Sequence, residues 1–427
     1  MMRAPLPTHS TRRWPVALAG ALLLLSGCSG KPDAEILTEI PWALISRPLV
    51  MDTHTHTRFS DGKYQVDEIV PLAISHGCNV LAITDHSDLG EDAATPEYFT
   101  AIKLARAAHP DLILFGGIEW NIPPYGGREH VTVLLNPDIE ETVLGPFKQQ
   151  FEQDNATAEQ ALDWLADKVG SVNNAALIYN HPSRKDDDPK ENLQDMLGWL
   201  DTSQLFIGFE GAPGHQNSKW TGSYRHGILP QDRWDPVAAS IGGSWDQLLD
   251  IGHNVHAAIA ASDYHNENLD HAPCAFSRTH IYPDDHTARG ILAGLRAGSF
   301  WSDHGLILDD LLFTLSAPGL PLPVTPGEVV RLTASQPLTF TVMLQRGSGA
   351  VDSSLIVELI GNGRSSKPEL LHSKELLADE NRVDWIQNDA VAGADGRSVY
   401  LRLRVRKPVE DGPDLMAYTN AIRVVTR

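Results

Sequence analysis

Short apolar runs alternate with segments of helical periodicity from Pro48 to Gly305. Such runs predict buried strands, and apolar residues three and four positions apart predict helices that cover a sheet. The predicted strands are Val80–Thr84, Leu112–Glu119, Val131–Leu135, Leu177–Asn180, Leu205–Glu210 and Ala257–Ser262. The predicted helices are Val66–Ser75, Glu97–Ala108, Ala156–Lys168, Trp245–Ile251 and Ala288–Ala297. This alternation predicts repeated βα units around a parallel sheet that closes into a barrel. An open doubly wound sheet is the alternative, but no Gly-rich dinucleotide fingerprint follows the first strand.

After Gly305 the pattern changes to strands in which apolar and polar residues alternate. The segment Leu401–Arg406 shows this best, with apolar side chains on one face and arginines on the other. The same pattern appears in Leu338–Leu344, Leu355–Ile360 and Ala421–Val425. Alternation of this kind is typical of an antiparallel sheet with one solvated face. We therefore predict a β-sandwich over residues 306–427, with Arg402, Arg404 and Arg406 on a solvated face or, alternatively, in a basic binding strip.

The first residues have the pattern of an export signal. Arg3, Arg12 and Arg13 precede the apolar run Val16–Leu25, which is too short for a stable transmembrane helix. The run is followed by a sequence that resembles the bacterial lipobox, in which Cys28 would be lipidated. The sequence thus predicts a lipoprotein signal peptide at 1–27 and a linker at 28–47; a cleaved signal with a chance Cys is the alternative. Ser29 favours anchoring to the outer membrane, facing the periplasm.

Composition limits the remaining choices. The chain has 427 residues, enough for two domains, which we place at 48–305 and 306–427. Its formal charge of −21, from 34 basic and 55 acidic residues, disfavours a nucleic-acid polymer as partner and leaves a small-molecule substrate. Beyond the signal, Cys78 and Cys274 are the two remaining cysteines. We interpret them as small buried apolar residues and expect no disulfide framework. The oligomeric state is not predicted.

Residues that bind metals recur where predicted strands end. His54 and His56 are one residue apart, so on a strand their side chains point the same way. Thr-Asp-His, Asn-His-Pro and Ser-Asp-Tyr-His sequences end later strands. Each residue alone has an ordinary structural explanation, but barrel enzymes place their chemistry at one set of strand ends, where unneutralised carboxylates would be costly. The candidate ligands are His54, His56, Asp61, His86, Glu119, His130, His181, Asp263 and His265.

These motifs resemble those of the polymerase and histidinol phosphatase (PHP) superfamily over roughly residues 50–305. The resemblance implies a distorted (β/α)7 barrel with two or three divalent ions (Zn, Mn or Fe). It assigns one ion to His54, His56 and Asp263, with Glu119 bridging to a second ion on His130 and His181. The third ion would be held by Asp61, His86 and His265. The residues from Gly294 to Gly305, with the β-rich tail, are similar to the CehA/McbA type of metallohydrolase.

The resemblance leads to a predicted hydrolase that acts on small phosphate mono- or diesters, in which a hydroxide shared between metal ions attacks phosphorus. Three divalent ions would outweigh three carboxylates and favour an oxyanion. A carboxylester or carbamate hydrolase and a non-catalytic binding lipoprotein are the alternatives. Asp85, beside His86, is a candidate proton donor or supporting residue, or a helix cap. His215, on the long segment after Glu210, and Arg128 and Arg184 are further candidates for contacting the substrate.

Overall fold

The structure, a computed structural model, describes residues 34–123, 129–152, 156–184, 189–224, 233–332, 337–362, 367–387 and 398–426. All of these residues belong to one compact unit, Asp33–Arg427. The predicted signal peptide and the first six residues of the predicted linker (28–33, with Cys28) lie outside the described residues, as does Arg128. Within the described ranges, no helix is both long and apolar enough to cross a membrane.

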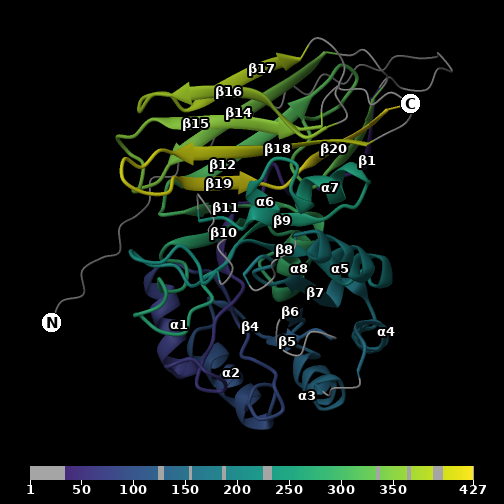
Figure 1. The fold of residues 1–427 in the computed structure, drawn as a ribbon, viewed down its shortest axis with the longest axis vertical. Helices are drawn as coiled ribbons and strands as arrows, with labels where there is room; N and C mark the ends of the chain where they lie inside the picture. Colours follow the sequence, from purple (N-terminus) through teal and green to yellow (C-terminus); the bar gives the residue numbers. More distant parts are fainter. Residues whose placement is uncertain are drawn as a thin grey trace. The chain divides into compact units, whose positions relative to one another are not determined.

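The part of the chain that precedes Gly305 carries every described α-helix (Figure 1). Its helices are α1 (Val66–Ser75), α2 (Pro96–Ala108), α3 (Glu140–Phe151), α4 (Ala158–Val169), α5 (Pro189–Thr202), α6 (Pro236–Ala239), α7 (Ser244–Asp250) and α8 (Ala288–Ala297), with a 3₁₀ turn η1 (Val172–Asn174). Its strands after the N-terminal β1 (Ala34–Thr38) are β2 (Leu49–Asp52), β3 (Val80–Ile83), β4 (Ile113–Gly116), β5 (Ile118–Asn121), β6 (His130–Leu135), β7 (Ala175–Tyr179), β8 (Phe206–Ala212), β9 (His256–Ala260), β10 (Ser277–Ile281) and β11 (Phe300–His304). The alternation of strands and helices predicted from the sequence is therefore confirmed, although α3, α5 and α6 were not predicted.

The strands form a curled α/β sheet in two pieces. One piece runs β11-β10-β2-β3-β4, with β2, β3 and β4 parallel, and the other runs β5-β6-β7-β8-β9. Two parallel bridges, Thr55 with Tyr264 and His86 with Glu119, join the pieces just beyond the ends of β2, β9 and β3. The predicted distorted barrel thus has its two sheets joined at the edge that carries the predicted ligands. The antiparallel pairings of β6 with β5 and β7, and of β10 with β2 and β11, depart from repeated βα units.

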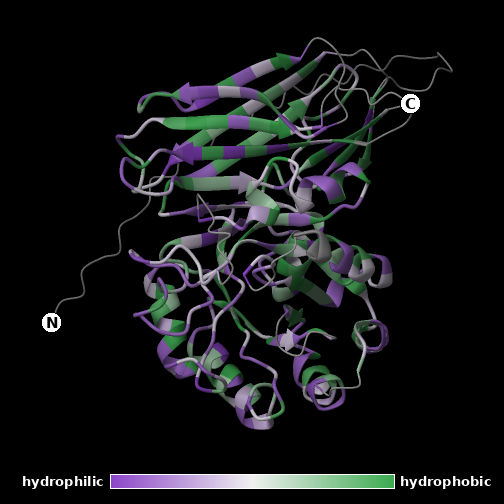
Figure 2. Ribbon diagram, in the orientation of Figure 1, coloured by the Kyte–Doolittle hydropathy of each residue, from purple (hydrophilic) through white to green (hydrophobic). Residues whose placement is uncertain are grey.

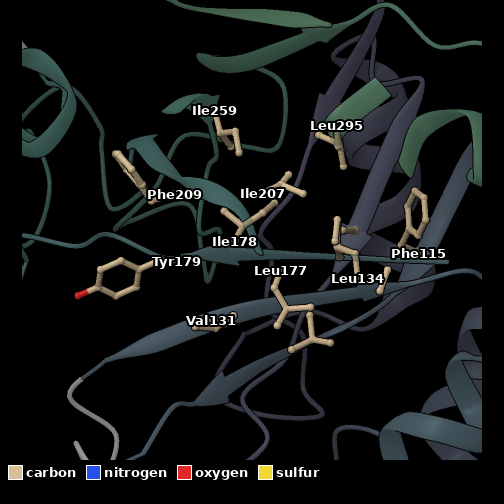
Figure 3. Packing of buried hydrophobic residues seen from close by; sticks show 14 of the residues in the cluster. Phe115, Val131, Leu134, Leu177, Ile178, Tyr179, Ile207, Phe209, Ile259 and Leu295 are labelled. Carbon is tan, nitrogen blue, oxygen red and sulfur yellow. The ribbon is translucent and has the colours of Figure 1, made fainter. Parts of the chain in front are cut away.

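Buried apolar side chains from successive strands fill the space between these sheets and the helices. Figure 3 shows Phe115 from β4, Leu134 from β6, Ile178 from β7 and Leu295 from α8 among the labelled side chains. Each of these four is fully or almost fully buried. Burial of such a side chain contributes roughly 1.5–3 kcal/mol, so this core holds the strand ends in fixed positions.

Two local predictions were wrong at strand ends. The segment Leu112–Glu119 forms parts of two strands, β4 and β5, because strand pairing is interrupted at Gly117. A Cβ at this position would lie 2.7 Å from the Val133 carbonyl oxygen. The His54 and His56 pair was placed on a strand, but β2 ends at Asp52. The pair still aligns, because the His54 carbonyl accepts from Asp263 N and His56 N donates to the Tyr264 carbonyl, each at 2.9 Å.

The rest of the chain forms strands alone. They are β12 (Leu308–Ser316), β13 (Val329–Leu332), β14 (Leu338–Arg346), β15 (Leu355–Gly361), β16 (Glu369–Leu376), β17 (Arg382–Gln387), β18 (Ser398–Lys407), β19 (Leu415–Thr419) and β20 (Ile422–Thr426). The strands β12, β14 and β17 form one sheet. The others join a larger sheet that runs β1-β13-β20-β18-β19 and continues through β11 into the first piece described above, with β15 and β16 paired beside β18. The two sheets enclose a second apolar core, and hydrophobic and hydrophilic residues alternate along their strands in Figure 2. Because β11 pairs with β19, the larger sheet continues across residue 305. The domain boundary at 305 stays a prediction.

The predicted solvated arginine face is wrong. Arg402 is fully buried, and its guanidinium forms two hydrogen bonds with Asp246 of α7, at 2.8 and 3.0 Å. Arg404 and Arg406 pair with Glu358 of β15 at 2.7 and 3.1 Å. The arginines therefore do not form a free basic strip either, because this face of β18 contacts the helices of the preceding part.

The interpretation of the two cysteines also needs correction. Cys78 and Cys274 are buried, as predicted, but they form a disulfide that joins positions 196 residues apart, with a Cα–Cα distance of 5.7 Å. Cys78 follows α1, and Cys274 lies on the segment after the His265 motif. The N–H of Cys274 also donates to Asp52 at 3.3 Å, and Asp52 accepts from the N–H of His54. The disulfide therefore supports the backbone that carries several predicted ligands.

Removing this disulfide is expected to lower the free energy of unfolding by about 2–5 kcal/mol, since a crosslink over a long loop restricts the unfolded chain. The test compares urea unfolding of the wild type and of Cys78→Ala, each with and without a thiol reductant. We expect the reductant to destabilise the wild type and to leave the variant unchanged. Equal stability of the oxidised wild type and the variant would contradict the prediction.

Candidate metal centre

The strand ends bring all nine predicted ligands into one connected cluster. His54 and His56 follow β2, His86 follows β3, Glu119 lies in β5, His130 begins β6 and His181 follows β7, while Asp263 and His265 follow β9 and Asp61 lies on the turn after His56. Of these residues, only Asp61 has a side chain that is more than half exposed, at 54%. The ligands therefore approach one point from many separate elements, as the strand-end argument requires.

Glu119 lies at the centre of the cluster. Its Oε1 is 2.9 Å from His130 Nδ1 and 3.1 Å from His181 Nε2. Its Oε2 is 3.1 Å from His86 Nδ1 and 3.3 Å from Nε2 of both His54 and His56. One buried carboxylate thus faces five imidazoles, with each oxygen directed to a different group of them. A carboxylate in such a position can bridge two cations.

A second group lies toward the exposed side of the cluster. His56, Asp61, His86 and His265 have potential ligand atoms within 4.8 Å of one another. His265 Nε2 is 3.2 Å from Asp61 Oδ1, and His265 Nδ1 is 2.8 Å from the Asp263 carbonyl oxygen. The structure therefore brings together the residues that the resemblance assigned to a third ion. It also places His86 beside Glu119, between the two groups.

Asp263 links the ligand cluster to the buried side chain of Arg184. Its Oδ1 is 3.1 Å from His56 Nε2, while its Oδ2 accepts from the buried Arg184 guanidinium at 2.7 Å. The backbone of Asp263 has φ +48°, and that of His181 has φ +33°. Non-glycine residues rarely adopt such angles, and strain of this kind is retained where the surrounding structure fixes it, often at functional sites.

The electrostatics follow from burial and the short carboxylate contacts. Burial lowers the pKa of His56, but Asp263 and Glu119 outweigh it and raise the pKa to about 10. Burial would raise the pKa of Glu119, but His130, His54 and His86 hold it well below its usual value. The pKa of His86 falls to about 4, mainly through burial. The carboxylates therefore favour positive charge at the centre, and a metal ion would have to displace protons from the histidines to bind.

The donor set fits divalent metal ions. His86 Nδ1 and Asp263 Oδ1 are among the buried side-chain atoms that form no hydrogen bond of suitable geometry in the described residues, although each lies 3.1 Å from an ionisable neighbour. Buried polar atoms without partners are uncommon, and both atoms are directed into the ligand cluster. Imidazole and carboxylate together are typical ligands of Zn, Mn and Fe. The residues present therefore suit the metals that the sequence predicts.

The candidates outside the ligand set have different positions. Asp85 is buried, and its carboxylate accepts from Thr57 N, Thr57 Oγ1 and Ser60 Oγ, each at 2.7 Å. It therefore fixes the turn after His56 and does not cap a helix. His215 and Arg184 lie at the cluster, beside Asp263. Arg128 cannot be placed, because it lies outside the described residues.

The sequence analysis missed Glu210, which supports two ligands. This fully buried carboxylate accepts from His54 Nδ1 at 2.8 Å and from His181 N at 3.0 Å. A metal-binding histidine commonly donates its second ring N–H to a carboxylate, which fixes the ring orientation. The sequence did contain a signal for this residue: Glu210 ends a predicted strand, as most of the predicted ligands do.

Replacing Glu210 with Gln is expected to weaken metal binding about 10- to 100-fold, because His54 would lose the charged partner that orients it. Competition with a chromophoric chelator measures this change. Glu97→Gln, on the exposed side of α2, is the matched control and should bind metal as the wild type does. Unchanged affinity in Glu210→Gln would show that the carboxylate has no orienting role.

A family comparison agrees with this geometry. Residues 52–139 match the family model of the PHP domain, a span that contains six of the nine predicted ligands. No curated protein matches the chain significantly. In structure, the chain is similar to a two-domain protein from Bacteroides vulgatus that contains a predicted PHP-like metal-dependent phosphoesterase, with 15% identity over 88% of this chain and 95% of that chain and a TM-score of 0.42. It is also similar to an amidohydrolase from Chromobacterium violaceum with bound sulfate and no metal, with 18% identity over 52% of this chain and 89% of that chain and a TM-score of 0.33. Both TM-scores are below 0.5, so these two similarities carry no part of the assignment.

The PHP-domain match and the His and carboxylate clusters at the strand ends of a curled α/β sheet support a metal-dependent hydrolase. The family match places a PHP domain at residues 52–139. The resemblance to the PHP superfamily is thereby confirmed for residues 52–139, whereas the similarity to the CehA/McbA type stays a prediction.

Proposed function

We propose that the protein hydrolyses small phosphate mono- or diesters at a site of three divalent ions. The observation that carries this proposal is the buried carboxylate of Glu119 in contact with five imidazoles. In this proposal Glu119, with the histidines that it contacts, would hold two ions, and Asp61, His86 and His265 would hold a third. When bound, such ions lower the pKa of a water molecule and neutralise charge that develops on the ester.

Charge favours phosphate over a carbon ester. Asp61, Glu119 and Asp263 supply three negative charges to the ligand set, which three divalent ions would exceed, although the buried carboxyl groups of Glu210 and Asp270 next to the ligands reduce the surplus. The guanidinium of Arg184 adds a buried positive charge. Burial alone would lower its pKa, but Asp263, whose Oδ2 is 2.7 Å away, outweighs burial and raises the pKa. A positive surplus in a partly buried site binds a phosphate oxyanion more strongly than a neutral carboxylester or carbamate.

A substrate panel tests the proposal. The protein loaded with Mn, Fe or Zn is assayed on p-nitrophenyl phosphate, bis(p-nitrophenyl) phosphate, naphthyl acetate and a naphthyl carbamate. We expect turnover of one or both phosphate esters. Turnover of the carbon esters alone would overturn the phosphate assignment in favour of the CehA/McbA type of activity. The absence of any turnover with all three metals would favour a non-catalytic binding protein.

We also propose that the protein is exported and anchored to the envelope through lipid on Cys28, in the outer membrane facing the periplasm. The arginines and apolar run before Cys28 support export. The Cys78–Cys274 disulfide adds support, because such bonds persist in oxidising compartments. Cys28→Ala should move the protein from the membrane fraction to the soluble envelope fraction. Retention in the membrane fraction would contradict a lipid anchor on this residue.

A further inference from the structure

His215 lies at the metal centre although no ligand motif contains it, and one of its ring nitrogens lies within 4.8 Å of potential ligand atoms of His265 and Asp270. Its ring is 4.9 Å from that of His265, and its Nε2 is 3.6 Å from Asp263 Oδ2. The side chain is 24% exposed, more than that of any histidine in the predicted ligand set. One edge of the imidazole therefore faces the cluster, while another part remains open to solvent, where a substrate would enter.

A buried carboxylate fixes the orientation of this imidazole. Asp270 Oδ1 is 2.8 Å from His215 Nδ1, and Asp270 Oδ2 accepts from His265 N at 2.7 Å. A carboxylate only accepts hydrogen bonds, so Nδ1 of His215 carries the proton in this contact. With Nδ1 bonded to Asp270, Nε2 is the ring nitrogen that faces the cluster.

The backbone around His215 is arranged for this position. A Cβ at Gly214 would lie 2.0 Å from the Ser262 carbonyl oxygen and 2.2 Å from Asp263 Cβ, so only glycine lets the segment approach so closely. His215 itself has φ +54°. The side chain of Asn217 donates to the carbonyls of Asn268 and Leu269 at 3.0 and 2.9 Å. These contacts hold His215 against the segment that carries Asp263, His265 and Asp270, in a conformation that a non-glycine residue rarely adopts.

We propose that His215 is a catalytic residue whose Nε2 accepts a hydrogen bond from the attacking water and directs its oxygen at the ester, and that Asp270 is its positioning residue. The inference rests on the proposed function and goes beyond it, because it identifies which group outside the ligand set orients the nucleophile. No bond to His215 forms or breaks. Its contribution is orientation, which commonly changes rates by about 100-fold when a reacting group is misplaced by about 1 Å.

The test compares His215→Gln, Asp270→Asn and the double variant on the phosphate ester that the wild type hydrolyses best. We expect His215→Gln to lower kcat about 100-fold, with KM changed less than about threefold and with bound metal unchanged by elemental analysis. Asp270→Asn presents an amide N–H to the ring, which favours the tautomer with the proton on Nε2. It should also lower kcat, and the double variant should lose no more than His215→Gln alone.

Glu267→Gln is the matched control, because Glu267 lies on the same segment as Asp270 but forms an exposed pair with Lys63. It should keep the wild-type kcat. Thermal melting confirms that each variant is folded, and His215→Gln carries the test if Asp270→Asn does not fold. Unchanged kcat in His215→Gln, or additive losses in the double variant, would overturn the roles of His215 and Asp270 alone. A wild-type protein that hydrolyses no ester would overturn the proposed function and this inference together.

Discussion

Replacing Glu119 with Ala is expected to remove at least one metal ion per chain and to lower kcat/KM about a thousandfold or more. Glu119 contacts imidazoles from four separate elements, so no neighbouring carboxylate can replace it as a bridge. Its loss would also leave several buried histidines without their shared negative partner. Loss of the ions removes the stabilisation of developing charge, and about 4 kcal/mol of this stabilisation corresponds to the expected change in rate.

Elemental analysis and steady-state kinetics on the same preparations measure the two effects. Glu119→Gln separates charge from shape, because the amide keeps the side-chain volume but cannot bridge cations as a carboxylate does. Glu328→Gln is the control for loss of a buried carboxylate far from the centre, where Glu328 accepts from Ile40 N and Thr325 N. The control should retain its metal. Wild-type metal content in both Glu119 variants would show that Glu119 is not a ligand.

The sequence predicted the ligand set because metal chemistry limits both residue type and position. His54, His86 and His181 each follow a buried strand, and parallel strands end at the same edge of a sheet. Strand ends are recognisable from apolar runs, so the convergence of these residues needed no knowledge of tertiary contacts. The exact strand limits mattered little, since His54 and His56 align through contacts with the segment after β9, beyond the end of β2.

Residues that act through other residues were harder to predict. Glu210 and Asp270 hold histidines by hydrogen bonds, and neither lies at a fixed spacing from its partner. The same reason applies to the disulfide, because nothing local to Cys78 indicates a partner 196 residues away. Helix α3 was missed because Gly145 and Pro146 interrupt its pattern. Glu210, Asp270 and the disulfide depend on contacts between residues far apart in the sequence, whereas the residues of α3 have a low helix propensity that its packing overrides.

The arginine face of β18 shows the largest consequence of a long-range contact. Alternation along a strand predicts two faces but does not predict what covers each of them. Arg402 contacts Asp246 and lies 4.7 Å over the Trp245 ring, so α7 covers this face. The sequence pattern was therefore correct about the strand and wrong about its environment. The covered face also means that the β-rich part and the PHP-containing part share a buried ion pair.

Replacing Arg402 with Ala is expected to lower the free energy of unfolding by about 3–5 kcal/mol, because Asp246 would remain buried without its cation. Urea unfolding measures the change. Arg382→Ala is the control: it breaks an exposed pair with Asp384, which should change stability by no more than about 1 kcal/mol.

A double variant, Arg402→Met with Asp246→Leu, removes both charges and should recover most of the loss, since a buried ion pair can be replaced by apolar residues of similar volume. If Arg402→Ala costs no more than Arg382→Ala, the pair does not link β18 to α7 energetically. A large loss that the double variant does not recover would place the stabilisation in the packing of the Arg402 stem against Trp245 and not in its charge.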